Sequence, residues 1–147
     1  MYRQLYDEFL TSDDSLRVYE GGQLIFSSKG DRLSPLLEYI ERFVPGTEQV
    51  VIFDNIMGNA AALLSVRADC REVYSPLGSQ LAIKTLDTYH IKYYLANIVP
   101  FIQKPGREDM CPMERLSVDK GPEEFYEIMK NITNKPRTYI REQTSPV

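Results

Sequence analysis

The chain has 147 residues, of which 43% are hydrophobic and 26% charged, and this is the composition of an ordinary globular protein of about one domain. Its net charge of −4 argues against a nucleic-acid partner, because contacts to phosphates depend on clustered lysine and arginine. No apolar stretch approaches the ~20 residues of a membrane-spanning helix, which argues against a membrane partner.

The N-terminal segment and the cysteines favour a cytoplasmic protein. Residues 1–10 carry charges throughout and lack the apolar core and the cleavage site of a signal peptide. Cys70 and Cys111 cannot form a disulfide framework, and thiols inside cells are reduced by default. We expect one folded domain over residues 1–133, followed by a flexible C-terminal tail over residues 134–147.

The N-terminal third predicts a helix, a hairpin and a second helix. Apolar residues recur at helical spacing over residues 2–10. Two β-prone runs, at 16–19 and 23–27, flank a Glu-Gly-Gly turn, as in a β-hairpin. The pair Ser34-Pro35 then predicts an N-cap and a first helical position for a helix over residues 36–44.

The middle of the chain alternates between predicted strands and helices. A helix begins at the small residues after Gly58, and another begins at Ser79, which is a good N-cap. Helices of about three turns are long enough to connect parallel strands. Together with the hairpin, the pattern predicts an α/β protein: a three-layer α/β/α sandwich around a mixed five-stranded sheet. The predicted segments are strands at 50–53, 71–75 and 91–95, a turn at 76–78, and helices from 58 to about 67–70 and from 80 to 89.

The C-terminal third is less regular. Residues 98–109 are rich in proline and glycine, and we expect no regular structure there or in the segment that follows Cys111. A last helix is predicted from Gly121, because a proline follows at its start, acidic residues occupy its first turn and apolar residues share one face.

Small and polar residues gather where the predicted parallel strands end. In open α/β sheets, ligands bind beyond the carboxyl ends of the strands, beside helix N-termini whose N–H groups attract anions. The alternative is that these residues only form turns and caps. The candidate ligand-binding residues are Asp54, Asn55, Gly58, Asn59 and Ser79, with Ser28 and Gly30 approaching from the hairpin side.

Cys111 and Glu114 are the candidate catalytic residues, a thiol and a carboxylate in one short segment. A reactive cysteine needs a nearby cation or helix N-terminus that lowers its pKa. The alternative is a structural cysteine, because cysteine is often buried and inert. We expect no metal and no cofactor, because the topology places His90 and Cys70, the other soft metal ligands, on the far rim of the sheet.

The Cys-Pro-Met-Glu element at residues 111–114 is the most specific motif in the chain. Together with Asp54 and the Gly-Asn-Ala-Ala run at 58–61, it resembles the signature of an uncharacterised bacterial family of small proteins. The resemblance covers residues 16–129 and implies a cytidine-deaminase-like fold, an α/β/α sandwich. The family pattern carries a lysine where this chain has Asn59.

The resemblance does not imply deamination. Zinc-dependent deaminases hold their metal with His and Cys at the starts of two helices. The corresponding segments of this chain, residues 31–35 and 56–60, contain neither residue type. The leading hypothesis is therefore a zinc-less deaminase-fold domain that binds a small molecule or an anion at a strand-end pocket near Gly58.

Two other functions stay open on the sequence alone. In the first, Cys111 is a nucleophile or a sulfur carrier and Glu114 is its acid–base partner, which makes the protein an enzyme. In the second, the chain is an interaction module that self-associates into a homo-oligomer, because its ten tyrosines suit an aromatic surface.

Overall fold

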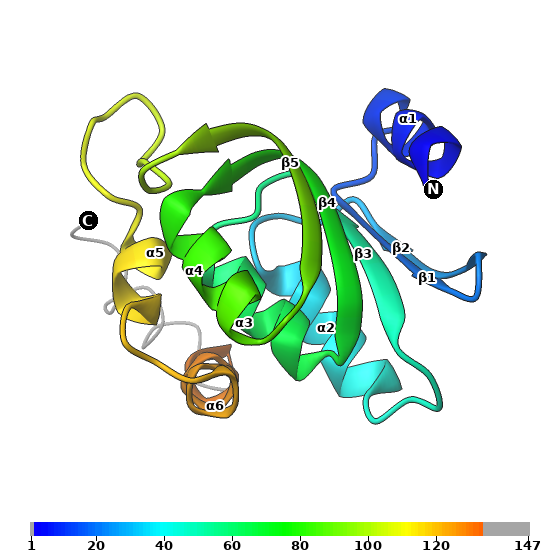
Figure 1. The fold of residues 1–147 in the computed structure, drawn as a ribbon. Coiled ribbons are helices and arrows are strands. Elements are labelled where there is room, and N and C mark those ends of the chain that lie inside the picture. Colours follow the sequence, from blue (N-terminus) through cyan, green and yellow to red (C-terminus); the bar gives the residue numbers. More distant parts are fainter. Residues whose placement is uncertain (1, 134–147) are drawn as a thin grey trace.

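The structure is a computed structural model in which residues 2–133 are described (Figure 1). No helix within this range is long and apolar enough to cross a membrane. The helices are α1 (Arg3–Thr11), α2 (Ser34–Phe43), α3 (Asn59–Arg67), α4 (Gln80–Thr88), α5 (Pro112–Ser117) and α6 (Pro122–Thr133), and the strands are β1 (Leu16–Glu20), β2 (Gln23–Ser28), β3 (Val50–Asp54), β4 (Cys70–Ser79) and β5 (Lys92–Val99).

The five strands form one mixed sheet in the order β2-β1-β3-β4-β5. Strand β1 pairs antiparallel with β2 and β3, whereas β3, β4 and β5 run parallel. Helices α3 and α4 connect the parallel strands, because a parallel pair needs a crossover of that length. The prediction of an α/β protein with a mixed five-stranded sheet is confirmed.

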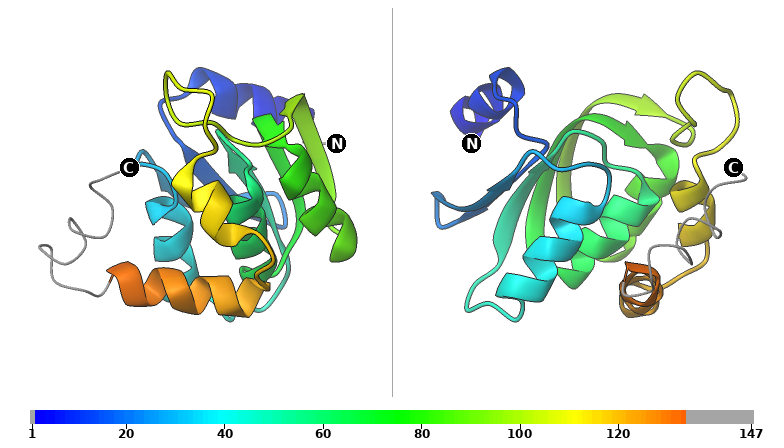
Figure 2. Two further views of the ribbon diagram at one scale, coloured as in Figure 1. Left: turned by 90° about the vertical axis from the view of Figure 1, so that its left-hand side faces the viewer. Right: turned by 180° about the vertical axis from the view of Figure 1, so that it is seen from behind.

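One face of the sheet packs against α2, α3 and α4 (Figure 2). Side chains alternate along each strand, so every second residue of β1 and β3 points to this face. Val18 and Ile52 are completely buried there, in the same core as Leu36 of α2 and Leu64 of α3. Helix α6 packs on α3 and adds Phe125. The main hydrophobic core therefore lies between the sheet and these helices.

Helix α1 packs on the opposite face through aromatic side chains. Tyr6 lies edge-on to Phe53 of β3 with ring centroids 6.0 Å apart, and Phe9 lies 5.8 Å from the same ring. Tyr74 of β4 and Tyr94 of β5 each lie 5.7 Å from Tyr6 and continue the aromatic layer toward the edge of the sheet. Aromatic pairs of this kind add about 0.5–1.5 kcal/mol beyond the area that they bury.

Strand β4 is longer than predicted, and the expected turn at residues 76–78 is wrong. The chain continues there as a strand that stays paired with β5. The carbonyl oxygen of Pro76 accepts a hydrogen bond from the side chain of Asn97 at 3.1 Å. A side chain at Gly78 would collide with Leu95, so this glycine permits close packing of two strands instead of a turn.

Three further predictions differ from the structure. Strand β5 reaches Val99, inside the segment that was expected to be irregular. The segment after Cys111 forms helix α5, because a proline in its first turn begins a helix as readily as it interrupts one. Ser34 is not an N-cap, because the backbone is already helical at Leu33, which holds that position. The predicted tail, residues 134–147, lies outside the described residues.

Candidate functional site

Two predicted site segments meet where β3 and β4 end. Beyond β3, Met57 donates its N–H to the carbonyl of Leu77 at 2.8 Å and accepts the N–H of Ser79 at 3.2 Å. These bonds place Gly58, the N-cap residue of α3, beside the start of α4. Ser79 caps α4 as predicted, because its hydroxyl accepts the N–H of Ala82 at 3.0 Å.

The carboxylate of Glu114 occupies the N-terminal end of α3. One of its oxygens accepts the N–H of Asn59 at 2.5 Å, and the other accepts the N–H of Ile102 at 2.9 Å. The residue is 2% exposed. A Cβ at Gly58 would lie 2.9 Å from the same carboxylate, so glycine makes room for it. The negative charge that this helix end attracts is thus supplied by α5.

Asn59 is buried and connects three helices. Its side-chain amide donates to the carbonyl and hydroxyl oxygens of Ser117 in α5, at 3.2 and 3.0 Å. Its side-chain oxygen accepts the hydroxyl of Thr85 in α4. Ser117 in turn donates its hydroxyl to the carbonyl of Glu114 at 2.6 Å. The polar groups around Gly58 therefore bind one another.

Asp54 ends β3 and is 8% exposed. Burial raises the pKa of its carboxyl group to about 7, although the nearby backbone N–H groups of Ile56 and Asn55 oppose the rise. A group with such a pKa can take up or release a proton near neutral pH. Asn55 is exposed, and its N–H donates to the carbonyl of Ser15 at 3.2 Å.

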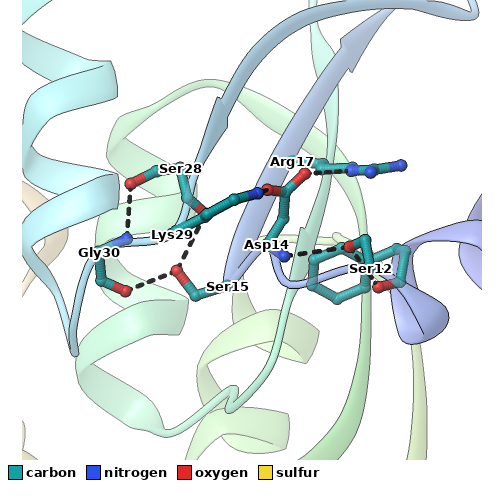
Figure 3. A network of polar contacts seen from close by, with 8 residues as sticks. Ser12, Asp14, Ser15, Arg17, Ser28, Lys29 and Gly30 are labelled. Atoms are coloured by element: carbon teal, nitrogen blue, oxygen red, sulfur yellow. Dashed lines mark hydrogen bonds and ion pairs between the residues drawn. The ribbon is translucent and has the colours of Figure 1, made fainter.

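Ser28 and Gly30 belong to a polar network at the same edge of the sheet (Figure 3). The hydroxyl of Ser15 lies 3.1 Å from the carbonyl oxygen of Ser28 and 2.6 Å from that of Gly30, and donates to them. The hydroxyl of Ser28 accepts the N–H of Gly30 at 3.0 Å. Ser15 also accepts the N–H of Asn55, so the structure brings Ser28 and Gly30 close to Asn55. The hydrogen bonds of these two residues are made within the network.

Asp14 is the buried charge of this network, and the sequence gives no signal for it. Its two oxygens accept hydrogen bonds from Arg17 Nε at 2.7 Å and Lys29 Nζ at 2.8 Å (Figure 3). Burial disfavours the charged form, but the hydrogen bonds and charges of Lys29 and Arg17 outweigh it and lower the pKa of Asp14. Because both oxygens are paired, the carboxylate joins the start of β1 to the end of β2.

A cavity of about 210 Å³ lies between α3, α4 and the turn that follows α5. Lys84 and Lys120 bring two positive charges to its wall, and neither forms an ion pair with another residue in the range 2–133. Sequence reasoning missed this cavity, because its two lysines lie on different elements and belong to no local motif. Its wall is completed by Asn59, Leu63, Leu81, Thr85, Thr88, Tyr89, Val118 and Asp119.

A wider hollow of about 430 Å³ lies at the other end of the strands. Gly21, Glu48, Gln49 and Arg71 border it. These residues come from the β1–β2 turn and from the starts of β3 and β4. None of the predicted site residues lies there, and its two charged groups have opposite sign.

Cys111 is half-buried at the N-cap position of α5, and its N–H donates to the carbonyl of Ile102 at 2.7 Å. Both carboxylate oxygens of Glu114 are bonded to backbone N–H groups, and a catalytic role for the two residues stays a prediction. Cys70 is buried at the start of β4, and burial raises its pKa; His90 follows α4. Within residues 2–133, no group of three or more His, Cys, Asp or Glu is placed to hold a metal ion.

Comparison with known proteins assigns the chain to a family. Residues 6–133 match the family TM1506, described as a domain of unknown function, DUF1893. The chain belongs to the DUF1893 family. Its structure is similar to the crystal structure of a DUF1893 family protein (TM1506) from Thermotoga maritima, with 28% sequence identity and a TM-score of 0.79, over 88% of this chain and 87% of that chain. None of the curated proteins matches. The expected membership of an uncharacterised family is confirmed.

Proposed function

We propose that this DUF1893 family member is a small-molecule-binding domain whose ligand carries an anionic group. The ligand would occupy the cavity between α3, α4 and the turn after α5. The observation that carries the proposal is the presence of Lys84 and Lys120 at one cavity, without a carboxylate partner among residues 2–133. Ammonium groups in this situation bind phosphate or carboxylate through charge-assisted hydrogen bonds.

The other polar groups of the cavity favour a ligand that also carries hydroxyl or amino groups. The hydroxyl of Thr88 donates to the backbone of Lys84 at 2.7 Å, and that of Thr85 donates to Asn59. Both oxygens keep lone pairs that can accept hydrogen bonds. Asp119 adds a carboxylate to the lining. A volume of about 210 Å³ suits a compound smaller than those in ligand pockets of ~300–1,000 Å³.

The proposed ligand lies beside α3 and not at the N-terminus of this helix, where the sequence predicts it. Glu114 holds the first N–H of α3, so a second anion there would have to displace a buried carboxylate. Asn59 is shared by the two places, since it lines the cavity and begins α3. A role in binding for the other strand-end residues stays a prediction.

The finer description of the fold is part of the same proposal: a three-layer α/β/α sandwich of the cytidine-deaminase-like class that works without zinc. Its support is the order of elements, a hairpin followed by β3-α3-β4-α4-β5, and the position of α1 on the face opposite to α2, α3 and α4. The two helix starts that would hold zinc in a deaminase carry no His or Cys.

Titration calorimetry tests the binding site with three probes: inorganic phosphate, glycerol phosphate and succinate. We expect binding of at least one probe. Lys84→Ala and Lys120→Ala should each weaken it about tenfold or more, because a hydrogen bond to a charged group contributes ~1.5–3 kcal/mol. Lys92→Ala is the matched control, an exposed lysine outside the cavity, and should bind as the wild type does.

Two results would contradict the proposal. One is the absence of heat with all three probes. The other is binding that survives both lysine substitutions unchanged, since the ligand would then lie elsewhere. Circular dichroism of each variant confirms that the fold is intact, which is expected because Lys84 is exposed and Lys120 is half-buried.

A further inference from the structure

Within residues 2–133, strand β5 is an unpaired edge of the sheet. It is the last strand in the order β2-β1-β3-β4-β5 and pairs only with β4 among the described strands (Figure 1). Eight residues of β5 span about 26 Å at ~3.3 Å per residue, and every second one directs its N–H and C=O away from β4. Such a row of unpaired groups is a template for another strand.

The sequence of β5 itself does little to protect this edge. Natural sheets commonly blunt exposed edges with charges, proline, bulges or very short strands. In β5 only the first residue, Lys92, is charged, and residues 93–99 contain neither a charge nor a proline. The opposite edge strand, β2, is shorter, ends in two serines and pairs with an irregular register between Val18 and Tyr19 of β1.

Two large side chains of β5 stand exposed on the same face. Tyr94 is 48% exposed and Ile98 is 47% exposed. They are four residues apart, so with Ala96 between them they point to the face that carries α1. Leu95 points to the other face and is buried in the main core. Tyr94 is also the outermost ring of the aromatic layer, 6.1 Å from Tyr74.

We propose that two copies of the chain associate through β5, antiparallel and centred on Ala96, so that the two sheets form one continuous sheet. A strand can pair with its own copy around a two-fold axis, because the contact is then identical for both subunits. With Ala96 opposite its own copy, Tyr94 of each chain lies opposite Ile98 of the other. Pairs of an aromatic and a β-branched residue are among the favourable cross-strand pairs.

Pairing of the two β5 strands centred on a neighbouring residue gives less favourable cross-strand contacts. Centring the pair on Leu95 would set Lys92 against Ile98 and Tyr94 against Ala96. Centring it on Asn97 would leave Tyr94 opposite Pro100, which has no N–H to donate. Of these three registers, only the one centred on Ala96 pairs the two exposed side chains with each other and extends the aromatic layer across the two-fold axis.

The number of residues in β5 sets the expected strength of the association between the two copies. A stable interface of standard size involves about 20–30 residues from each side. The eight residues of β5 supply fewer, so the dimer should be reversible and depend on concentration. An unrelated extended peptide could use the same edge, but the self-complementary positions of Tyr94 and Ile98 favour a second copy.

Sedimentation velocity of the full chain tests the association. We expect the mass to rise from one chain toward two between ~1 µM and ~1 mM. Ile98→Lys and Tyr94→Lys should keep the chain monomeric over this range, because two buried ammonium groups would meet the partner strand. Leu24→Lys, which changes an exposed leucine of β2, should dimerise as the wild type does. A monomer at all concentrations, or a dimer unaffected by Ile98→Lys, overturns the proposal.

Cysteine cross-linking tests the register. In a Cys111→Ser background, Ala96→Cys should form an intermolecular disulfide on treatment with diamide, since opposed residues of antiparallel strands have Cα atoms ~4.5–5.5 Å apart. Asn97→Cys should not, because its two copies are offset by two residues along the strands. Cross-linking at residue 97 without cross-linking at residue 96 overturns the assigned register. Both substitutions are at exposed positions, and far-UV circular dichroism checks their fold.

Discussion

Glu114 shows how a helix end can be satisfied by a side chain that is remote in sequence. The N-terminus of α3 has N–H groups without partners in the helix and the positive end of the helix dipole. The sequence predicts this helix start from Gly58 and the small residues after it. It does not predict the partner, because Glu114 is 55 residues from Asn59 and no local pattern relates the two.

Glu114→Ala is expected to lower the free energy of unfolding by about 2–5 kcal/mol. The substitution leaves the N–H groups of Asn59 and Ile102 without an acceptor, and each buried unsatisfied group costs about 1–3 kcal/mol. Glu114→Gln keeps one acceptor oxygen and should lose about half as much. Urea unfolding followed by circular dichroism measures the effect. Glu127→Ala, at an exposed glutamate of α6, is the control and should change stability by less than ~0.5 kcal/mol.

The measured stability of Glu114→Ala distinguishes a structural role of this residue from an acid–base role. If Glu114→Ala and Glu127→Ala were equally stable, the carboxylate would not hold α5 against α3. The residue would then be available for the acid–base role predicted beside Cys111.

Asp54 is expected to make stability fall as the pH rises toward and through neutrality. Burial raises its folded-state pKa to about 7, above that of an aspartate in the unfolded chain. The folded state therefore holds the proton more tightly. Its stabilising contribution is complete below the unfolded pKa and is lost as the pH rises through the folded one, by up to about 1.4 kcal/mol per pH unit.

Asp54→Asn isolates this effect, because asparagine is neutral at every pH. The free energy of unfolding of the variant, relative to that of the wild type, should be higher at pH 8 than at pH 5. Urea unfolding at both pH values measures it. Asp31→Asn changes an exposed aspartate and should show no such difference. If Asp54→Asn and the wild type differ by the same amount at both pH values, Asp54 does not titrate between them.

At the scale of elements, local sequence patterns predict whether a segment is a helix or a strand better than they predict its length. The β-branched run of β3 and the capped start of α4 are where the sequence predicts them. Strand β4 is longer than predicted because Pro76 and Gly78 are turn-forming residues when read locally. Their strand conformation depends on partners in β5, Asn97 and Leu95, and these contacts are not visible in the sequence of β4.

Asp14→Ala is expected to lower the free energy of unfolding by about 2–3 kcal/mol by disconnecting β1 from the end of β2. The bond to Arg17, which is 18% exposed, is the stronger one. Lys29 is 67% exposed and therefore screened by solvent, so Lys29→Ala should cost less than ~1 kcal/mol. Urea unfolding at pH 7 compares both variants with Asp13→Ala, at an exposed neighbouring aspartate.

The Asp14 contribution should also depend on pH. Since the folded-state pKa of Asp14 is lowered, its stabilisation is present above the pKa of an unfolded aspartate and is lost as the pH falls through the folded value. The stability difference between the wild type and Asp14→Ala should therefore shrink in acid. A difference that is constant with pH would mean that the carboxylate stabilises β1 by packing alone.

At the scale of the whole molecule, the two faces of the sheet are covered unequally. One face is buried by α2, α3 and α4 with α6 packed behind, whereas α1 covers the other through the aromatic layer. The alternation of strands and helices predicts the sheet and its parallel half, because crossover connections leave few topologies. It does not predict where α1 packs, since that depends on Phe53, Tyr74 and Tyr94, which lie 47, 68 and 88 residues after Tyr6 in three strands.

The predicted domain of residues 1–133 can be tested by truncation. The family match ends at residue 133, and the main core closes within the described range through α6, where Phe125 and Met129 are buried. A chain that ends at Thr133 should keep the full chain's free energy of unfolding within ~0.5 kcal/mol. A chain that ends at Lys120 lacks α6 and should lose more than ~3 kcal/mol, the cost of deleting one buried phenylalanine side chain. If both truncations were equally harmful, residues 134–147 would belong to the folded domain and the predicted boundary would be wrong.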